Sequence, residues 1–301
     1  MNTQQYFNSY SSYLKIERSF SDNTIESYLR DIRFFLQFIN EKYSEINIRD
    51  IDSNIISEYL IIVNEEKKSK RTQSRIISSL RSFFKYLRLE KLVQESPMDM
   101  IELPQQDRKL PDVLNLEDIN KIIDSIDLSN PNGQRNKAII EMLYSCGLRV
   151  SELINLRISD IDKDSMFIKV KGKGNKERLV PLGKTALKQI NLYFDNYRIH
   201  ISPVKNAEDI LFLNRGGGKL SREMIFIIVK ELTDKAGIKK NVSPHTFRHS
   251  FATHMIQRGA DIRIVQDMLG HESILTTEIY THIDKQHLRD AVDKYHPFND
   301  L

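Results

Sequence analysis

Residues 243–282 read SPHTFRHSFATHMIQRGADIRIVQDMLGHESILTTEIYTH, and this stretch organises the C-terminal part of the chain. Ser243 followed by Pro244 is typical of an N-cap and the first residue of a helix. Gly259 and Gly270 then end two successive helices, because glycine readily adopts the left-handed conformation at a helix C-terminus. Predicted N-caps precede the second and third helices, at Asp261 and Ser273. The stretch therefore predicts three short helices that turn back on one another.

Four residues of this stretch carry groups suited to chemistry on a phosphodiester: His245, Arg248, His271 and Tyr280. His245 and Arg248 are three residues apart, so they share one face near the N-terminus of the first helix. A helix N-terminus favours a bound phosphate, because its free N–H groups and its dipole attract negative charge. Tyr280 supplies a hydroxyl that could act as a nucleophile.

A zinc site is the alternative interpretation of the same helix. His245 and His249 are four residues apart, and His254 follows nearby. The usual zinc helix has the pattern HExxH, with a glutamate next to the first histidine. Here Arg248 lies between the histidines, and its permanent charge opposes a bound cation. We therefore expect no metal site.

Apolar residues recur at helical spacing through residues 1–103 and predict a small helical bundle. A helix is expected at the start of the chain, with further helices over 25–39, 53–63 and 72–89. The last of these carries a basic face made of Arg75, Arg81, Lys85 and Arg88. Contact with a polyanion and a merely solvated helix face both explain such a run of charge. Nothing in this bundle has a catalytic pattern.

Residues 104–112 predict an extended linker between two domains. Pro104 and Pro111 block a helix interior, and the polar residues between them have no core pattern. The second domain is predicted to begin with helices over 116–126 and 134–146. Further helices are expected over 185–197, 221–236 and 284–296.

Arg149 lies at a predicted junction between two helices. The helix over 134–146 ends at Gly147, which we expect in the left-handed conformation. Ser151 is the predicted N-cap of the next helix. On its position alone, Arg149 is either a surface ion-pair residue or part of a site.

The spacing of apolar residues changes from the helical pattern at residues 166–182. This change, with the glycines in the middle of the segment, predicts a β-hairpin with a glycine-rich turn. The turn is crowded by the basic residues Lys171, Lys173, Lys176 and Arg178. Its sequence GKGNK lacks the spacing and the following helix of a phosphate-binding P-loop. A basic hairpin that reaches into a groove and a plain solubilised turn both remain open at this point.

Composition restricts the class of protein. The net charge of +4 permits a polyanionic partner without requiring one. The excess lies in residues 104–301, which carry 30 basic and 26 acidic residues, against 15 of each in residues 1–103. The single cysteine, Cys146, excludes an internal disulfide framework and fits a reducing compartment. No apolar run is long enough for a membrane span and no secretory signal is evident, so we expect a cytoplasmic protein.

Five separated blocks together resemble the tyrosine recombinase (phage integrase) family, XerC/XerD type. They are GLRVSEL at 147–153, GKGNKERLVPL at 172–182, HTFRH at 245–249, LGH at 269–271 and YTH at 280–282. The hairpin block and the ending Tyr295-His296-Pro297 favour XerD over XerC. The resemblance covers essentially the whole chain and implies a mainly α fold. It implies a helical core-binding domain over 1–103, a linker over 104–112, and a mostly helical α/β catalytic domain with a small antiparallel sheet over 113–301.

The resemblance also implies the catalytic residues, which are Arg149, Lys173, His245, Arg248, His271 and Tyr280. The arginines and histidines would stabilise the extra charge on the scissile phosphate in the transition state. Tyr280 would attack phosphorus to form a 3′-phosphotyrosyl link, and Lys173 would protonate the leaving 5′-oxygen. Because the link stores the bond energy, neither ATP, a metal nor another cofactor is implied. Glu152 is expected to support Arg149.

The implied partners are a duplex DNA recombination site, a XerC-like partner recombinase and an FtsK-type DNA translocase. Four protomers would assemble on two DNA sites. DNA contacts are expected from Gln73, Arg75, Arg81, Lys171, Lys176 and Arg222, and the candidates for reading base edges are Gln73, Arg75 and Arg222. The helix over 284–296 either packs on its own domain or is donated to a neighbouring protomer. The implied role is resolution of chromosome dimers during cell division.

Three other functions remain to be weighed. A mobile-element integrase would have the same chemistry and a different target. A DNA-binding protein with this fold and no catalysis is disfavoured, because the whole catalytic set is present. A metal-dependent nuclease is disfavoured too, because the stretch has no cluster of acidic residues to hold the metal.

Overall fold

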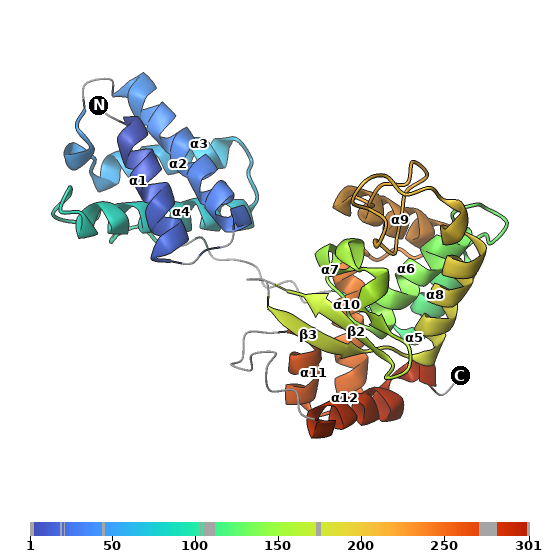
Figure 1. Ribbon diagram of the computed structural model, residues 1–301. Helices are drawn as coiled ribbons and strands as arrows, with labels where there is room; N and C mark the ends of the chain where they lie inside the picture. Colours follow the sequence, from blue (N-terminus) through green and yellow to red (C-terminus); the bar gives the residue numbers. More distant parts are fainter. Residues whose placement is uncertain are drawn as a thin grey trace. The chain divides into compact units, whose positions relative to one another are not determined.

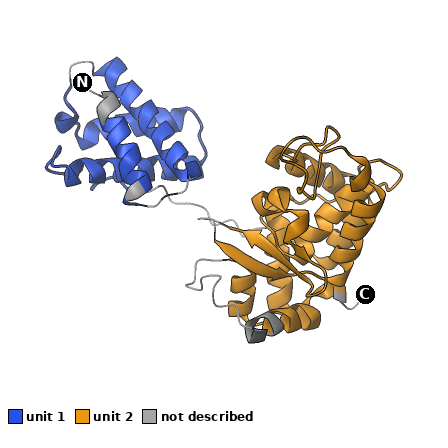
Figure 2. Ribbon diagram, viewed as in Figure 1, with its two compact units in different colours: residues 1–109 blue, residues 110–301 orange. Residues whose placement is uncertain are grey.

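The computed structural model describes residues 3–18, 20, 22–43, 46–102, 104, 112–172, 176–270 and 282–299. The chain divides into two compact units, Met1–Lys109 and Leu110–Leu301 (Figure 2). Each unit has a hydrophobic core of its own. No helix among the described residues is long and apolar enough to cross a membrane.

Unit 1 is a bundle of helices (Figure 1). Its elements are α1 (Thr3–Ile16), α2 (Asp22–Lys42), the 3₁₀ turn η1 (Ile48–Asp50), α3 (Ser53–Glu65) and α4 (Lys70–Leu89). Side-chain caps fix two helix starts: Asp52 accepts from the backbone N–H of Ile55, and Ser69 accepts from that of Thr72. The predicted helical bundle is confirmed.

Unit 2 is mostly helical. Its helices are α5 (Leu116–Asp124), α6 (Gly133–Ser145), α7 (Val150–Asn155), α8 (Lys184–Asn196), α9 (Arg222–Lys235), α10 (Pro244–Gln257), α11 (Ile262–Leu269) and α12 (His282–Tyr295). Short 3₁₀ turns lie at η2 (Ile158–Asp160), η4 (Arg198–His200) and η6 (Pro297–Asn299). The predicted helices over 116–126, 134–146, 185–197 and 221–236 agree with these bounds within two residues.

A small antiparallel sheet completes unit 2. It has the order β1-β2-β3, with β1 (Ile161–Asp162), β2 (Phe167–Lys171) and β3 (Glu177–Pro181). The backbone N–H of Gly172 donates to the carbonyl of Lys176 at 2.7 Å, which closes the hairpin beyond the last strand pair. The hairpin prediction is confirmed, and β1 is an addition that was not predicted. The mainly α fold with a small antiparallel sheet is therefore confirmed.

The junction between α6 and α7 differs from the prediction in one respect. Gly147 has a φ of +56°, as expected for a left-handed helix end. The N-cap of α7, however, is Arg149 and not Ser151. Glu152 reaches back and accepts from the backbone N–H of Arg149 at 2.8 Å, so the helix begins one residue after the arginine.

The helices of the 243–282 stretch follow the prediction as far as they are described. The predicted bounds of α11 are confirmed, and Gly270 ends it with a φ of +62°. The third predicted helix, with its cap at Ser273, lies in residues 271–281, outside the described residues. The C-terminal helix α12 packs against α10, α11 and β3 of its own unit (Figure 1). Donation of this helix to a neighbouring protomer remains a prediction.

Candidate active site

The centre of the candidate site is the buried carboxylate of Glu152 on α7, whose side chain is 1% exposed. Three arginines from different elements approach it. Arg178 of β3 donates to both oxygens, at 2.6 and 3.0 Å. Arg149 donates to one oxygen at 2.9 Å, and Arg248 of α10 has a nitrogen 4.0 Å from the other. One carboxylate thus joins the arginines from three places in the chain.

The C-terminus of α11 supplies further acceptors to the same arginines. Three consecutive carbonyl oxygens each accept one hydrogen bond: Met268 from Arg178 Nε (2.7 Å), Leu269 from Arg248, and Gly270 from Arg149 (2.9 Å). The last carbonyls of a helix lack partners within it and carry the negative end of the dipole. The arginine cluster therefore holds the end of α11 against α7. The next residue in the chain is His271, one of the predicted catalytic residues.

Glycine is required at the end of α11 for a steric reason as well. Its φ of +62° is rarely adopted by other residues. In addition, a Cβ on Gly270 would lie 3.0 Å from Cδ of Arg178 and 3.2 Å from its Nε. The backbone at Gly270 thus packs directly on the arginine side chain.

Burial and ion pairing fix the charges of the cluster. Burial opposes ionisation of Glu152, but its hydrogen bonds with Arg178 and Arg149 hold its pKa below the ordinary value. Burial, with the like charge of Arg149, lowers the pKa of Arg248 to about 9. That value still leaves Arg248 charged at neutral pH. Three cations and one anion leave an excess of two positive charges.

This excess positive charge is suited to a phosphate group. Arg178 and Arg248 are buried, whereas the side chain of Arg149 is 30% exposed. Arg149 is therefore the member of the cluster most accessible to a ligand. Fixed guanidinium groups match the geometry of phosphate oxygens and need little reorganisation when charge develops on them.

The histidines of α10 have different surroundings. His245 and His249 are exposed, whereas His254 is buried and its Nδ1 lies 2.9 Å from the hydroxyl of Tyr144. Burial lowers the pKa of His254 below its ordinary value. Its ring is therefore a neutral part of the core between α6 and α10. His245 is the second residue of α10 and lies in its first turn, as the sequence predicted.

Three of the predicted catalytic residues lie outside the described residues: Lys173, His271 and Tyr280. Two of them directly follow a described residue. Gly172, the residue after β2, precedes Lys173, and Gly270 precedes His271 at the end of α11. The structure thus brings together Arg149 and Arg248, which are separated by a long stretch of sequence. The catalytic roles of the whole set remain predictions.

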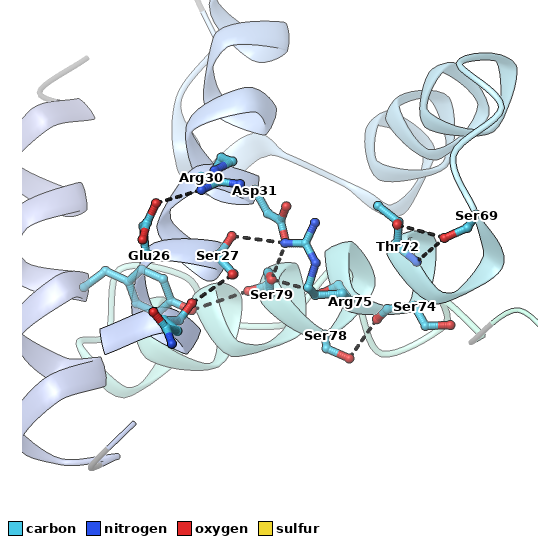
Figure 3. Close-up of polar contacts among 12 residues, drawn as sticks. Glu26, Ser27, Arg30, Asp31, Ser69, Thr72, Ser74, Arg75, Ser78 and Ser79 are labelled. Atoms are coloured by element: carbon cyan, nitrogen blue, oxygen red, sulfur yellow. Dashed lines mark hydrogen bonds and ion pairs between the residues drawn. The ribbon is translucent and has the colours of Figure 1, made fainter. Parts of the chain in front are cut away.

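The predicted DNA contacts of unit 1 already have partners within the unit. Arg75 joins α4 to α2 through the buried Asp31, and its Nη1 also donates to the carbonyl of Ser27 at 3.2 Å (Figure 3). The hydroxyl of Ser79 donates to the same carboxylate at 2.8 Å. Arg75 therefore stabilises the packing of two helices. A contact between Arg75 and DNA remains a prediction.

The other predicted DNA contacts vary in exposure. Gln73 donates to Asn64 at 3.1 Å, and Arg81 donates to the carbonyl of Ile101. The remaining candidates are exposed in unit 2: Lys171, Lys176 and Arg222. Lys171 also forms an ion pair with Glu177 at 3.4 Å. Contact between these residues and DNA remains a prediction.

Arg178 is the residue of this cluster that the sequence analysis missed. It was placed among the basic residues of the hairpin turn, but its side chain is only 7% exposed. A signal was present in the strand pattern. Arg178 and the buried Val180 are two residues apart on β3, so they face the same side of the sheet. A charged residue on the inward side of a strand indicates a buried partner.

Comparisons with known proteins agree over nearly the whole chain. The phage integrase family matches residues 112–287, and the N-terminal SAM-like domain of phage integrases matches residues 7–91. Tyrosine recombinase XerD of Oceanobacillus iheyensis is 44% identical over 285 residues, which are 95% of this chain and 96% of that protein. Tyrosine recombinase XerD of Listeria monocytogenes serotype 4b is 42% identical over the same shares. The crystal structure of XerH site-specific recombinase bound to its palindromic difH substrate is similar, with a TM-score of 0.70, 25% identity and coverage of 97% of this chain and 95% of that chain.

Proposed function

Because the chain belongs to the phage integrase family and is a site-specific tyrosine recombinase, we propose that it cuts and rejoins duplex DNA with Tyr280 as nucleophile. One observation carries most of this proposal. The cluster of Arg149, Arg178 and Arg248 around Glu152 leaves two positive charges beside the residue that precedes His271. A scissile phosphate needs such charge in its transition state.

The proposed cleavage step uses the two predicted catalytic arginines as fixed donors. In the transition state, the attacked phosphorus gains charge on its non-bridging oxygens, and Arg149 and Arg248 would compensate it. Glu152 would not contact the DNA, because its carboxylate is buried and both of its oxygens already accept hydrogen bonds. Its role would be to hold the arginine cluster in one geometry.

Three further residues would complete the proposed chemistry. His245 and His271 would add hydrogen bonds to the phosphate, and His245 would help deprotonate the attacking hydroxyl. Tyr280 would form a bond to phosphorus while the bond to the 5′-oxygen breaks. Lys173 would give that oxygen its proton. Religation reverses these steps and returns the energy held in the phosphotyrosyl link.

The proposed biological role is resolution of chromosome dimers in the cytoplasm. Support comes from the two XerD proteins, which match 95% of this chain at 44% and 42% identity. The XerH structure, which contains its difH substrate, supports a duplex DNA site as the target. By the same likeness, we propose a XerC-like partner, assembly of four protomers with exchange of α12, and activation by an FtsK-type translocase. Residues 1–103 would clamp the DNA and residues 113–301 would cleave it.

We expect a covalent protein–DNA adduct when the chain is mixed with a nicked suicide duplex in excess EDTA. The duplex carries the candidate chromosomal site, and the nick lets a short fragment diffuse away so that religation fails. The adduct is measured as a band of reduced mobility on a denaturing gel. A duplex with scrambled sequence is the control for site specificity. Cleavage that leaves no adduct, or that appears only when a divalent metal is added, contradicts the proposed function.

A further inference from the structure

Arg178 is the best-buried member of the arginine cluster and has no role in the catalytic set described above. Its guanidinium group makes three hydrogen bonds with two different elements. Nη1 and Nη2 donate to Glu152 of α7 at 2.6 and 3.0 Å, and Nε donates to the carbonyl of Met268 in α11 at 2.7 Å. Because Arg178 itself lies on β3, one side chain joins the sheet to both helices.

Two glycines pack beside this side chain, and each precedes a predicted catalytic residue. A Cβ on Gly172 would lie 3.7 Å from Nη1 of Arg178 and 3.9 Å from Oε1 of Glu152. A Cβ on Gly270 would lie 3.0 Å from Cδ of Arg178. The last described residue before Lys173 and the last described residue before His271 therefore both pack beside the Arg178 side chain.

The geometry of this pair demands arginine. The planar guanidinium offers donors in a fixed fork, so it can contact both carboxylate oxygens and, with Nε, a third acceptor. Lysine would keep the positive charge beside Glu152 but presents a single nitrogen on a flexible stem. It cannot hold Glu152 in a bidentate pair and bind the Met268 carbonyl in the same arrangement. Replacement by lysine thus keeps the positive charge at this position and removes the hydrogen bonds that join β3 to α7 and α11.

Arg178 also lies where it can fix the base of the hairpin. It is paired with Val170 in the register of β2 and β3, one step before the last pair, Lys171 with Glu177. The hydrogen bond from Gly172 to Lys176 follows that pair directly. The ion pair between Arg178 and Glu152 therefore fixes the ends of β2 and β3 that adjoin the turn. A displacement of about 1 Å in a reacting group can cost about 100-fold in rate.

We infer that Arg178 is a positioning residue, which fixes the β2–β3 hairpin against Glu152 so that Lys173 reaches the leaving 5′-oxygen. This inference rests on the proposed function. Arg178 acts through Lys173 and has no contact with DNA. In the step concerned, the bond between Tyr280 oxygen and phosphorus forms, the bond between phosphorus and the 5′-oxygen breaks, and that oxygen takes a proton from Lys173.

A sulfur substitution makes the proton transfer measurable. When the 5′-bridging oxygen is replaced by sulfur, the leaving thiolate is stable and needs little protonation. The ratio of the cleavage rates of the 5′-thio and 5′-oxygen duplexes therefore reports how well the acid works. A loss of folded protein lowers both rates equally and cancels in this ratio. A merely structural role for Arg178 would leave the ratio unchanged.

We expect Arg178→Lys to slow single-turnover cleavage of the 5′-oxygen duplex about 10- to 100-fold. Most of this loss should disappear with the 5′-thio duplex, so the ratio rises toward that of Lys173→Ala. Cleavage is followed on nicked suicide duplexes with the full chain. Gly270→Ala is a second variant, because its added methyl group would press on Cδ of Arg178 while the charge remains. If Arg178→Lys yields no folded protein, the rate ratio of Gly270→Ala tests the inference in its place.

Arg198→Lys is the matched control. Arg198 is also buried, but it donates to the backbone carbonyls of Ala207, Glu208 and Ile210, away from Glu152. Its replacement should leave the rate ratio at the wild-type value. If Arg178→Lys, or Gly270→Ala in its place, also keeps the wild-type ratio, the inference is overturned. A wild-type ratio in Lys173→Ala overturns it as well. Absence of any adduct from the wild-type chain is a different failure, because it contradicts the proposed function itself.

Discussion

Tyr280→Phe should abolish the covalent adduct on a nicked suicide duplex. The change removes a single oxygen atom, and without it no bond to phosphorus can form. We expect adduct formation to fall by at least about 10⁴-fold, because loss of a nucleophile cannot be compensated by the other groups of the site. The affinity for the duplex should persist, because the arginines and the phenyl ring remain. Gel mobility shift measures binding, and a denaturing gel measures the adduct.

Tyr295→Phe is the matched control for the nucleophile. Tyr295 is the last residue of α12, is only partly buried and packs against the core of unit 2. Removal of its hydroxyl should leave the adduct at the wild-type level. An adduct that survives Tyr280→Phe would remove Tyr280 from its proposed role.

Glu152→Ala should cause the largest loss of stability of any single change in the cluster. It leaves Arg178 and Arg248 as buried charges without a carboxylate, and it removes the acceptor of the Arg149 backbone N–H. Breaking a buried ion pair by removing one partner costs about 3–5 kcal/mol. For a unit of this size the midpoint of thermal unfolding should fall by roughly 6–20 °C. Calorimetry of the full chain measures the shift in the transition of unit 2.

Glu117→Ala provides the comparison for an exposed ion pair. Glu117 pairs with Lys121 at 2.7 Å one turn further along α5, and its side chain is 73% exposed. Such pairs contribute about 0–1 kcal/mol, so the midpoint should hardly move. If Glu152→Ala shifts the midpoint no more than Glu117→Ala does, then Glu152 does not hold the arginines as described.

The local secondary structure of the chain could be predicted from its sequence. Apolar periodicity and end signals were enough to place α11 between Asp261 and Gly270 and to place the hairpin over 166–182. These features depend on neighbouring residues only. Local rules failed at the start of α7, where the side chain of Glu152 shifts the N-cap from Ser151 to Arg149.

The partners within the site could not be derived from spacing. The resemblance to a family placed Arg149 and Arg248 in one site, but it left Arg178 among the surface cations. Arg178 and Met268 are 90 residues apart, and their hydrogen bond depends on how β3 packs against α11. Arg75 shows the same limit. Its position in the sequence gave no sign of its partner, Asp31 from another helix, and its contact with DNA remains a prediction.

The central claim is that the chain forms a 3′-phosphotyrosyl bond through Tyr280, and peptide mapping of the adduct tests it most directly. After nuclease and trypsin digestion, residues 264–285 form one peptide between Arg263 and Lys285, with Tyr280 as its only tyrosine. We predict that mass spectrometry finds the nucleotide remnant on this peptide, linked through a 3′-phosphate, with a free 5′-hydroxyl on the released strand. A remnant on any other peptide, or a link through a 5′-phosphate, would contradict the account.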